Sequence, residues 1–322
     1  MRADFVSQGG ASPSSGGERI SIVPSIRTLH STLELPSVGT LGYYSDTEAG
    51  GVPVVLVHSA GIGASTREVV PLFEMLRKAR TAYALDVPGF GTSTRILRHL
   101  DLQQVRDAIR TFMTRLASNH ATNVDVIAVG LSSEFVAQVA LEERNPIRSL
   151  TLISPTGLSA REESPWADVV ARAGEGVLRA PLLGGLAYTA LTSRINTRWR
   201  LHKHFSGPVD EALVEDTVAA SHSPTARFAN ASVLGRRLHT KDACSTLYGH
   251  IRVPTLVLFY EDPTTSFDRL PQLVARNAEV RARRIAHTKG MPHYEMTSEV
   301  LKLIEAFYDD RGLPTHQANF HH

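Results

Sequence analysis

Ser132 stands between a strand pattern and a helix pattern, where its hydroxyl could do chemistry. Val124–Val129 has the pattern of a strand, and residues 133–144 have the pattern of a helix. A sharp turn between such elements exposes a serine hydroxyl to a base, so Ser132 could act as a nucleophile. Serine is also a preferred helix N-cap, and this structural role is the alternative.

Groups that could complete such a site come late in the chain. Three carboxylates follow the apolar run at 253–259, namely Asp262, Glu261 and Asp268. Two histidines flank Gly290 in a later loop, namely His293 and His287. A nucleophilic site needs a base within hydrogen-bond reach of the hydroxyl and a group that orients the base. A solvated surface carboxylate is the alternative reading for each acid.

The histidines do not have the spacing of a metal site. No Cys/His cluster and no His-Glu-x-x-His pattern occurs, and Cys244 is the only cysteine. His202 and His204 are expected to lie on or line the helical region that contains them. We therefore expect neither a metal nor another cofactor.

Strand and helix patterns alternate over the first half of the chain. Weak strand patterns at 26–33 and 40–45 precede clearer strand patterns at 52–57, 81–87, 124–129 and 148–153. Ser65 with Glu68, and Asp101 with Gln104, have the capping-box spacing that starts a helix. This alternation predicts an α/β fold with a mostly parallel, doubly wound sheet.

The alternation stops after Pro155 and resumes at 253–259, with a last strand pattern near 281–285. The intervening segment is helix-like and is expected to form a cap, inserted after the sixth strand, over the sheet edge where ligands bind. The predicted organisation is a disordered tail at 1–20, core at 21–156, cap at 157–249, core at 250–312 and a flexible tail at 313–322.

Five segments resemble the α/β-hydrolase fold superfamily, and the resemblance extends from about residue 39 to 307. In chain order they read VPVVLVHSAGIGAS, ALDVPGFGTS, VIAVGLSSEF, VPTLVLFYEDP and MPHYEMTSEVLKLIEAF. They are similar to the family's oxyanion loop, its Asp-x-Pro-Gly loop, its nucleophile elbow, its acid-bearing strand and its histidine segment.

The resemblance implies a Ser-His-Asp triad in which Ser132 attacks, His293 is the base and Asp262 orients the imidazole. His287 is the second candidate for the base. The amides of Ala60 and Ser133 are implied to hold the oxyanion, and Ser59 and Glu134 are expected beside the substrate.

The sequence departs from the family pattern at three places. Glu134 replaces the usual small residue after the elbow, Ser59 replaces the usual glycine of the oxyanion loop, and no histidine directly follows Gly290. We expect the Glu134 carboxylate to be hydrogen-bonded and to face away from the oxyanion amides.

The sequence thus predicts a serine hydrolase for a small or medium-sized apolar ester or related acyl substrate. The alternatives are a non-hydrolytic enzyme of the same fold (a lyase, a carbon–carbon bond hydrolase or a cofactor-free oxidoreductase) and a catalytically degenerate ligand-binding member. The 34 Lys and Arg nearly balance the 32 Asp and Glu, so we expect a small-molecule partner rather than nucleic acid or membrane. The single cysteine and the polar N-terminal segment favour a cytoplasmic location.

Overall fold

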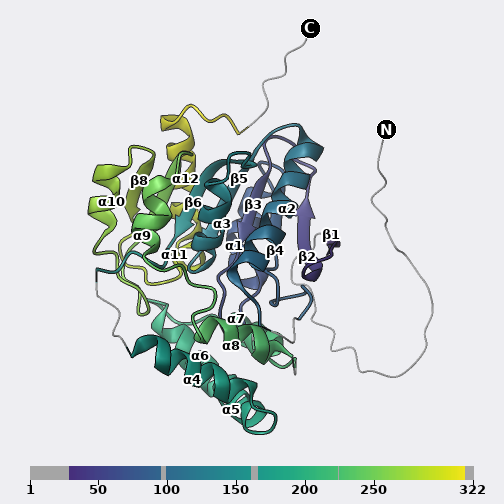
Figure 1. The fold of residues 1–322 in the computed structure, drawn as a ribbon. Coiled ribbons are helices and arrows are strands. Elements are labelled where there is room, and N and C mark those ends of the chain that lie inside the picture. Colours follow the sequence, from purple (N-terminus) through teal and green to yellow (C-terminus); the bar gives the residue numbers. More distant parts are fainter. Residues whose placement is uncertain (1–28, 96–98, 161–165, 224, 316–322) are drawn as a thin grey trace, which may run out of the picture.

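The computed structural model describes residues 29–95, 99–160, 166–223 and 225–315 (Figure 1). Within these residues the chain forms an eight-stranded sheet in the order β1-β2-β4-β3-β5-β6-β7-β8. Strands β1 and β2 pair antiparallel, β2 is antiparallel to β4, and the remaining pairs are parallel. The predicted fold class is therefore confirmed. The tail predicted at 1–20, residues 26–28 of the first strand pattern, and residues 316–322 lie outside the described residues.

The strands follow the apolar runs of the sequence closely. They are β1 (Leu29–Leu35), β2 (Gly39–Asp46), β3 (Val54–Val57), β4 (Ala82–Leu85), β5 (Val124–Val129), β6 (Ile147–Ile153), β7 (Thr255–Phe259) and β8 (Val280–Arg284). Every residue of β3, β4 and β5 is buried, because helices cover both faces of the parallel part of the sheet.

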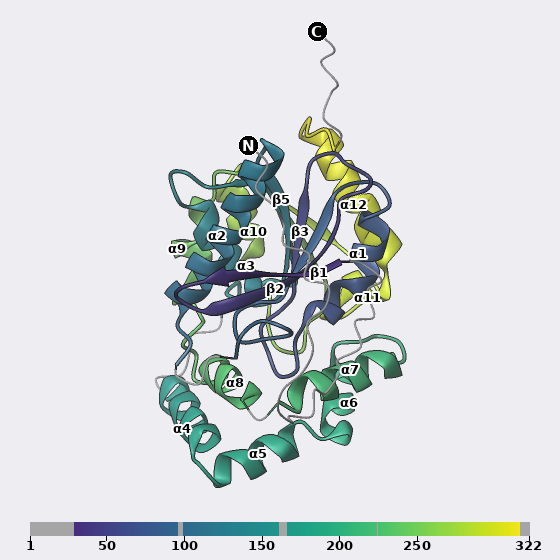
Figure 2. The same cartoon turned by 90° about the vertical axis from the view of Figure 1, so that its right-hand side faces the viewer.

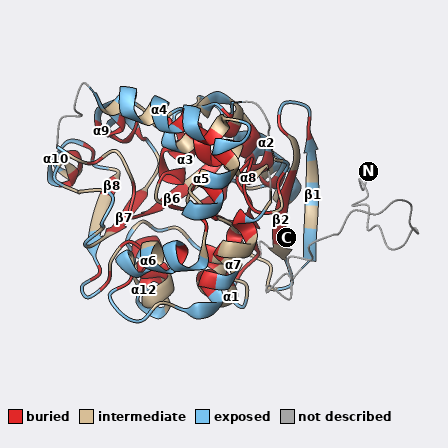
Figure 3. Cartoon of the chain, turned by 90° about the horizontal axis from the view of Figure 1, so that it is seen from below, coloured by how far each residue is buried: buried red, intermediate tan, exposed pale blue. Residues whose placement is uncertain are grey.

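Two helical layers enclose the sheet (Figures 2 and 3). The core helices are α1 (Val70–Leu76), α2 (Leu102–His120), α3 (Ser132–Ala140), α9 (Ala243–Thr246), α10 (Leu270–Arg276), α11 (Pro292–Glu295) and α12 (Thr297–Asp310), with 3₁₀ turns at Thr66–Val69 and Tyr248–His250. Helices α1 and α12 pack on one face, and α2 and α3 pack on the other. The capping box of Asp101 and Gln104 is present at the start of α2.

Most of the segment between β6 and β7, up to Leu234, forms a separate group of helices below the sheet (Figures 1 and 2). They are α4 (Ala167–Arg179), α5 (Leu183–Leu191), α6 (Arg194–Lys203), α7 (Glu211–Ser221) and α8 (Ala226–Leu234). These helices, called the cap below, have a small apolar centre of their own, consisting of Leu178, Tyr188, Ala226 and Ala231.

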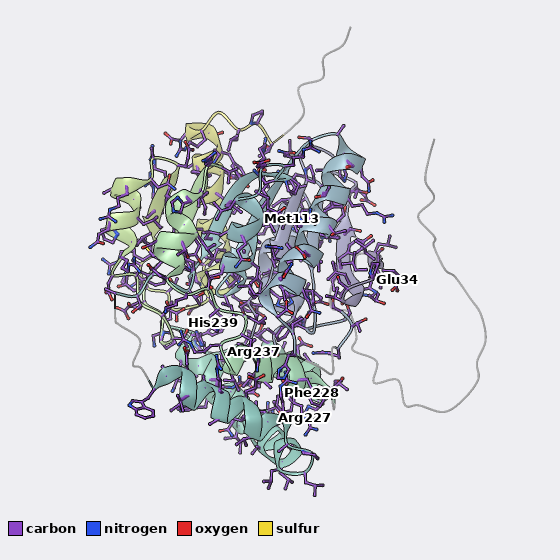
Figure 4. All side chains as sticks on the ribbon, viewed as in Figure 1. Glu34, Met113, Arg227, Phe228, Arg237 and His239 are labelled. Carbon is purple, nitrogen blue, oxygen red and sulfur yellow. The ribbon has the colours of Figure 1, made fainter. Side chains whose placement is uncertain are left out.

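Charged side chains also tie the cap together. Figure 4 shows Arg237 and His239 near the junction of the cap with the sheet layers, and Arg227 and Phe228 farther out on α8. The Nε of Arg237 donates to both oxygens of the buried Glu175 on α4, at 2.7 and 2.8 Å. None of the described helices combines the length and apolar character needed to cross a membrane.

Candidate functional site

A cavity of about 530 Å³ lies between the cap and the carboxyl edge of the parallel strands. The loops that follow β3, β5, β6, β7 and β8 line it from the core side, and helices α6 and α7 line it from the cap side. Ser59, Ala60, Gly130 and Asp262 are among the core residues at its wall, and His204 comes from the end of α6.

The turn after β5 brings Gly130, not Ser132, to the cavity. Gly130 has φ +54°, and Gly130 and Leu131 line the cavity. Ser132 is the first residue of α3, is fully buried, and donates its hydroxyl hydrogen to the backbone oxygen of His58 at 2.6 Å. In sites of this kind a sharp strand-to-helix turn presents the nucleophile. Here the residue of that turn with left-handed backbone conformation is Gly130.

Ser59 stands next to that glycine. A Cβ atom added to Gly130 would lie 3.3 Å from the Cβ of Ser59, so the missing side chain leaves the space beside Ser59 open. The Ser59 hydroxyl donates to Oε2 of Glu68 at 2.7 Å, and the Ser59 amide donates to the same oxygen at 3.1 Å. Both residues line the cavity.

Glu68 is a buried carboxylate at that cavity wall. Desolvation raises its pKa from the ordinary value to about 7, although the hydrogen bonds from the Ser59 side chain and backbone oppose the shift. The capping box predicted for Ser65 and Glu68 is not formed: the Ser65 side chain caps the helix by accepting from the amide of Arg67 at 3.4 Å, while the Glu68 carboxylate bonds to Ser59.

His58 fixes the loop that carries Ser59. Its Nδ1 donates to the backbone oxygen of Ser59, and its Nε2 accepts from the amide of Val87 at 3.1 Å. This pair of contacts requires the neutral imidazole with its hydrogen on Nδ1. Complete burial lowers the pKa of His58, which is consistent with the neutral form.

The amide of Ser133 is engaged within the turn, where it donates to the oxygen of Gly130 at 3.2 Å. It is therefore not available to hold an oxyanion, the role that the sequence analysis gave it. The amides of Ala60 and Leu131 both belong to cavity-lining residues, and neither donates a hydrogen bond to another described residue. Leu131 also precedes α3, whose positive dipole end favours negative charge at this point.

The structure does not join Ser132, His293 and Asp262 by hydrogen bonds. His293 is fully buried, and its two ring nitrogens have no hydrogen-bond partner among the described residues. Burial lowers the pKa of His293 to about 4, and the nearby backbone of Glu68 opposes the shift. His287, the second candidate, is exposed with φ +62°.

Asp262 instead lies near His204 and Gly290. Its Oδ1 accepts from the amides of Thr264 and Thr265 at 2.8 and 3.1 Å. A Cβ atom on Gly290 would lie 2.7 Å from Oδ2 of Asp262 and 2.4 Å from Nδ1 of His204. Burial lowers the pKa of His204, while the charge of Asp262 opposes the shift. The two other carboxylates considered, Glu261 and Asp268, are exposed.

Glu134 is buried at the base of the cap and is not part of the cavity wall. Its Oε1 accepts from the hydroxyl of Thr156, where the chain leaves for the cap, and its Oε2 accepts from the amide of Thr240, where the chain returns, at 2.6 Å. Desolvation raises its pKa, and the Thr156 and Thr240 hydrogen bonds oppose the shift. Small residues make room for it, because Gly157 lies directly beside Oε1.

Two residues of this site escaped the sequence reasoning. Glu68 has a local explanation as a helix-capping residue, and only the folded loop shows that its partner is Ser59. His204 was expected near the cap surface or lining, but nothing in its spacing indicated Asp262 as a neighbour. Among the described residues, no group of three or more His, Cys, Asp or Glu side chains could hold a metal ion.

Comparisons with known proteins agree with this architecture. Residues 54–303 match the model of the alpha/beta hydrolase family. A 238-residue stretch, 73% of the chain, is 28% identical to a Pseudomonas putida protein described as the dihydrolipoyllysine-residue acetyltransferase component of an acetoin cleaving system, and the match spans 60% of that protein.

Solved structures give the same result for the fold. A serine hydrolase involved in carbazole degradation superposes with a TM-score of 0.70 at 16% identity, covering 88% of this chain and all of the other. An esterase from Thermogutta terrifontis superposes with a TM-score of 0.66 at 18% identity, covering 90% of this chain and all of the other. The enol-lactonase of Burkholderia xenovorans LB400 superposes with a TM-score of 0.67 at 17% identity, covering 87% of this chain and all of the other.

Proposed function

Because the chain belongs to the alpha/beta hydrolase family, we propose that it hydrolyses a small or medium-sized apolar ester or related acyl compound in the cavity beneath the cap. The observation that carries this proposal is that Ser59 lines the same cavity as Ala60 and Leu131, whose amides donate no hydrogen bond to another described residue. Amides of this kind stabilise the oxyanion that forms when an acyl carbon is attacked.

The size of the cavity supports a small substrate. Ligand pockets for small molecules commonly measure about 300–1,000 Å³, and this cavity of about 530 Å³ lies within that range. The near balance of acidic and basic residues fits a small-molecule partner. The single, buried cysteine supports a cytoplasmic place of action as part of the proposal.

A series of p-nitrophenyl esters tests the activity. We expect purified protein to hydrolyse acetate to octanoate esters, with kcat/KM falling at dodecanoate because the longer chain exceeds the cavity. A fluorophosphonate probe should label the protein covalently, since it reacts with activated serine hydroxyls. The absence of both turnover and labelling in folded protein would contradict the proposal.

A second candidate is non-catalytic binding of an apolar ligand, favoured by the lack of hydrogen bonds joining Ser132, His293 and Asp262. In that case the p-nitrophenyl esters should raise the melting temperature without being consumed, because any ligand of the native state stabilises it. The ester series therefore separates the two candidates.

A further inference from the structure

Among the described serines that line the cavity, Ser59 is the one whose hydroxyl donates to a carboxylate, a partner that can take up its proton. It donates to Oε2 of Glu68 at 2.7 Å, a normal length for a hydrogen bond from a hydroxyl to a carboxylate. Ser132, by contrast, donates to a peptide oxygen, which is too weak a base to accept a proton. Resting on the hydrolytic function proposed above, we propose that Ser59 is the nucleophile of this site and that Glu68 is its general base.

The surroundings of Glu68 support this role. The carboxylate is 9% exposed and has no cation among its hydrogen-bond partners; its described partners are the hydroxyl and the amide of Ser59. Burial without a compensating positive charge makes a carboxylate more basic, and a base is most effective when its pKa lies near the working pH. The pKa of Glu68, raised to about 7, meets that condition.

The backbone around Ser59 holds its side chain in place. The ring of His58 donates to the backbone oxygen of Ser59, and the hydroxyl of Ser132 donates to the backbone oxygen of His58. The Ser59 amide is bound to Glu68 itself. Ser132 and His58 are therefore positioning residues, and the open space at Gly130 lets an acyl group approach Ser59.

The reaction balances with these groups and water alone. Ser59 Oγ attacks the acyl carbon, its proton passes to Glu68, and the oxyanion lies against the amides of Ala60 and Leu131. The ester C–O bond then breaks, and the leaving alcohol takes the proton from Glu68. A water molecule next attacks the acyl-enzyme, gives a proton to Glu68 and releases the acid, and the proton returns to Ser59 Oγ.

Mass spectrometry of the wild-type protein after fluorophosphonate labelling tests the assignment directly. We expect the added mass on the peptide that contains Ser59. Mass on the peptide that contains Ser132, or on any other serine, would overturn the inference while leaving the hydrolytic function intact. No labelling and no ester turnover at all would instead contradict the proposed function, so the two failures are distinguishable.

Variants give the second arm of the test. Ser59→Ala should lower kcat/KM for p-nitrophenyl butyrate at least about 1,000-fold, as loss of a covalent nucleophile does. The control is Ser266→Ala, because Ser266 also donates to a carboxylate, that of Asp268 at 2.6 Å, but does not line the cavity. Ser266→Ala should keep wild-type kcat/KM. Retention of activity in Ser59→Ala, with unchanged thermal melting, would overturn the inference.

The pH profile tests Glu68 separately. The wild-type kcat/KM should rise with pH through a single ionisation near 7, because only the ionised carboxylate accepts the proton. In Glu68→Gln the rate should fall about 100- to 10,000-fold and this ionisation should disappear from the profile. A purely structural role for Glu68 would leave the ionisation in place, and that outcome would also overturn the inference.

Discussion

At the residue scale, the acceptor of each hydrogen bond decides what a serine hydroxyl can do here. Ser132 and Ser59 are both close to His58, but Ser132 bonds to its peptide oxygen while Ser59 bonds to a carboxylate. A peptide oxygen can orient a hydroxyl but cannot deprotonate it, whereas a carboxylate does both. The two serines therefore have different roles despite their proximity.

Replacement of Ser132 should mainly affect stability. In Ser132→Ala the buried oxygen of His58 loses its donor, which costs about 1–3 kcal/mol. We expect the melting temperature to fall by about 1.5–5 °C, measured by circular dichroism. Fluorophosphonate labelling should persist on Ser59 with a rate reduced less than about 100-fold. Loss of labelling at an unchanged melting temperature would identify Ser132 as the reactive serine.

The buried ring of His293 should make the stability of the protein depend on pH in the acid range. Its pKa of about 4 lies below that of a histidine in the unfolded chain, about 6.5. The unfolded chain therefore takes up a proton first, so this stabilising contribution is complete above pH 6.5 and is lost as the pH falls toward 4. Glu68 acts in the opposite direction, because its raised pKa removes stability as the pH rises from about 4.5 toward 7.

A variant isolates the histidine contribution. Urea titrations should measure this contribution. When the pH falls from 7.5 to 5.0, the free energy of unfolding of His293→Gln should fall by about 2 kcal/mol less than that of the wild type. The Glu68 contribution is common to both proteins and cancels in the comparison. His222→Gln, at an exposed histidine, should keep the wild-type pH dependence. Equal pH dependence of His293→Gln and wild type would contradict the neutral, buried state of His293.

At the element scale, helix α3 connects the sheet to both ends of the cap. Its first turn carries Glu134, which accepts hydrogen bonds at the beginning and at the end of the cap segment, from Thr156 and Thr240. Gln138, one turn later, donates to the hydroxyl of Thr240 at 3.0 Å. The residue that departs most from the family pattern beside the elbow thus fixes the position of the cap.

Two substitutions at Glu134 separate shape from charge. Glu134→Gln should cost less than about 1 kcal/mol, because the amide oxygen can still accept from the Thr240 amide while the hydroxyl of Thr156 turns to accept from the NH₂ group. Glu134→Ala should cost about 2–4 kcal/mol, since it leaves buried donors unpaired and a void. Chemical denaturation measures both. A loss of ester turnover in Glu134→Gln at unchanged stability would give Glu134 a role in the chemistry.

The sheet could be predicted from the sequence because its signal is local. Fully buried strands such as β3 are built from continuous apolar runs, and these runs are visible without any knowledge of their neighbours. The site was harder to predict for two reasons. The pattern Gly-Leu-Ser does not reveal which residue takes the left-handed turn, and Gly130 takes it. Glu68 fits a capping box locally, while its actual hydrogen bonds join two separate loops.

At the scale of the whole molecule, the site exists only where the cap meets the core. Ser59, Glu68 and Gly130 come from the core, while His204 comes from the cap, so the distance between the two parts sets the shape of the cavity. Gly63, in the loop after β3, is packed closely against the cap. A Cβ atom there would lie 2.5 Å from both Cγ2 and the backbone oxygen of Thr217 on α7.

Gly63→Ala should therefore move the cap away from the core. The φ of +76° already disfavours a side chain at this position by about 1 kcal/mol, and the contact with the α7 backbone cannot relax by a simple rotamer change. We expect a lower melting temperature and faster hydrogen exchange in α7. Gly61→Ala is the matched control for stability, because Gly61 is in the same loop, has no atoms within 4 Å of an added Cβ and has no positive φ. If Gly63→Ala and Gly61→Ala melted at the same temperature and exchanged α7 amides at the same rate, the close packing of cap and core at this point would not hold in solution, and the shape of the cavity could not depend on it.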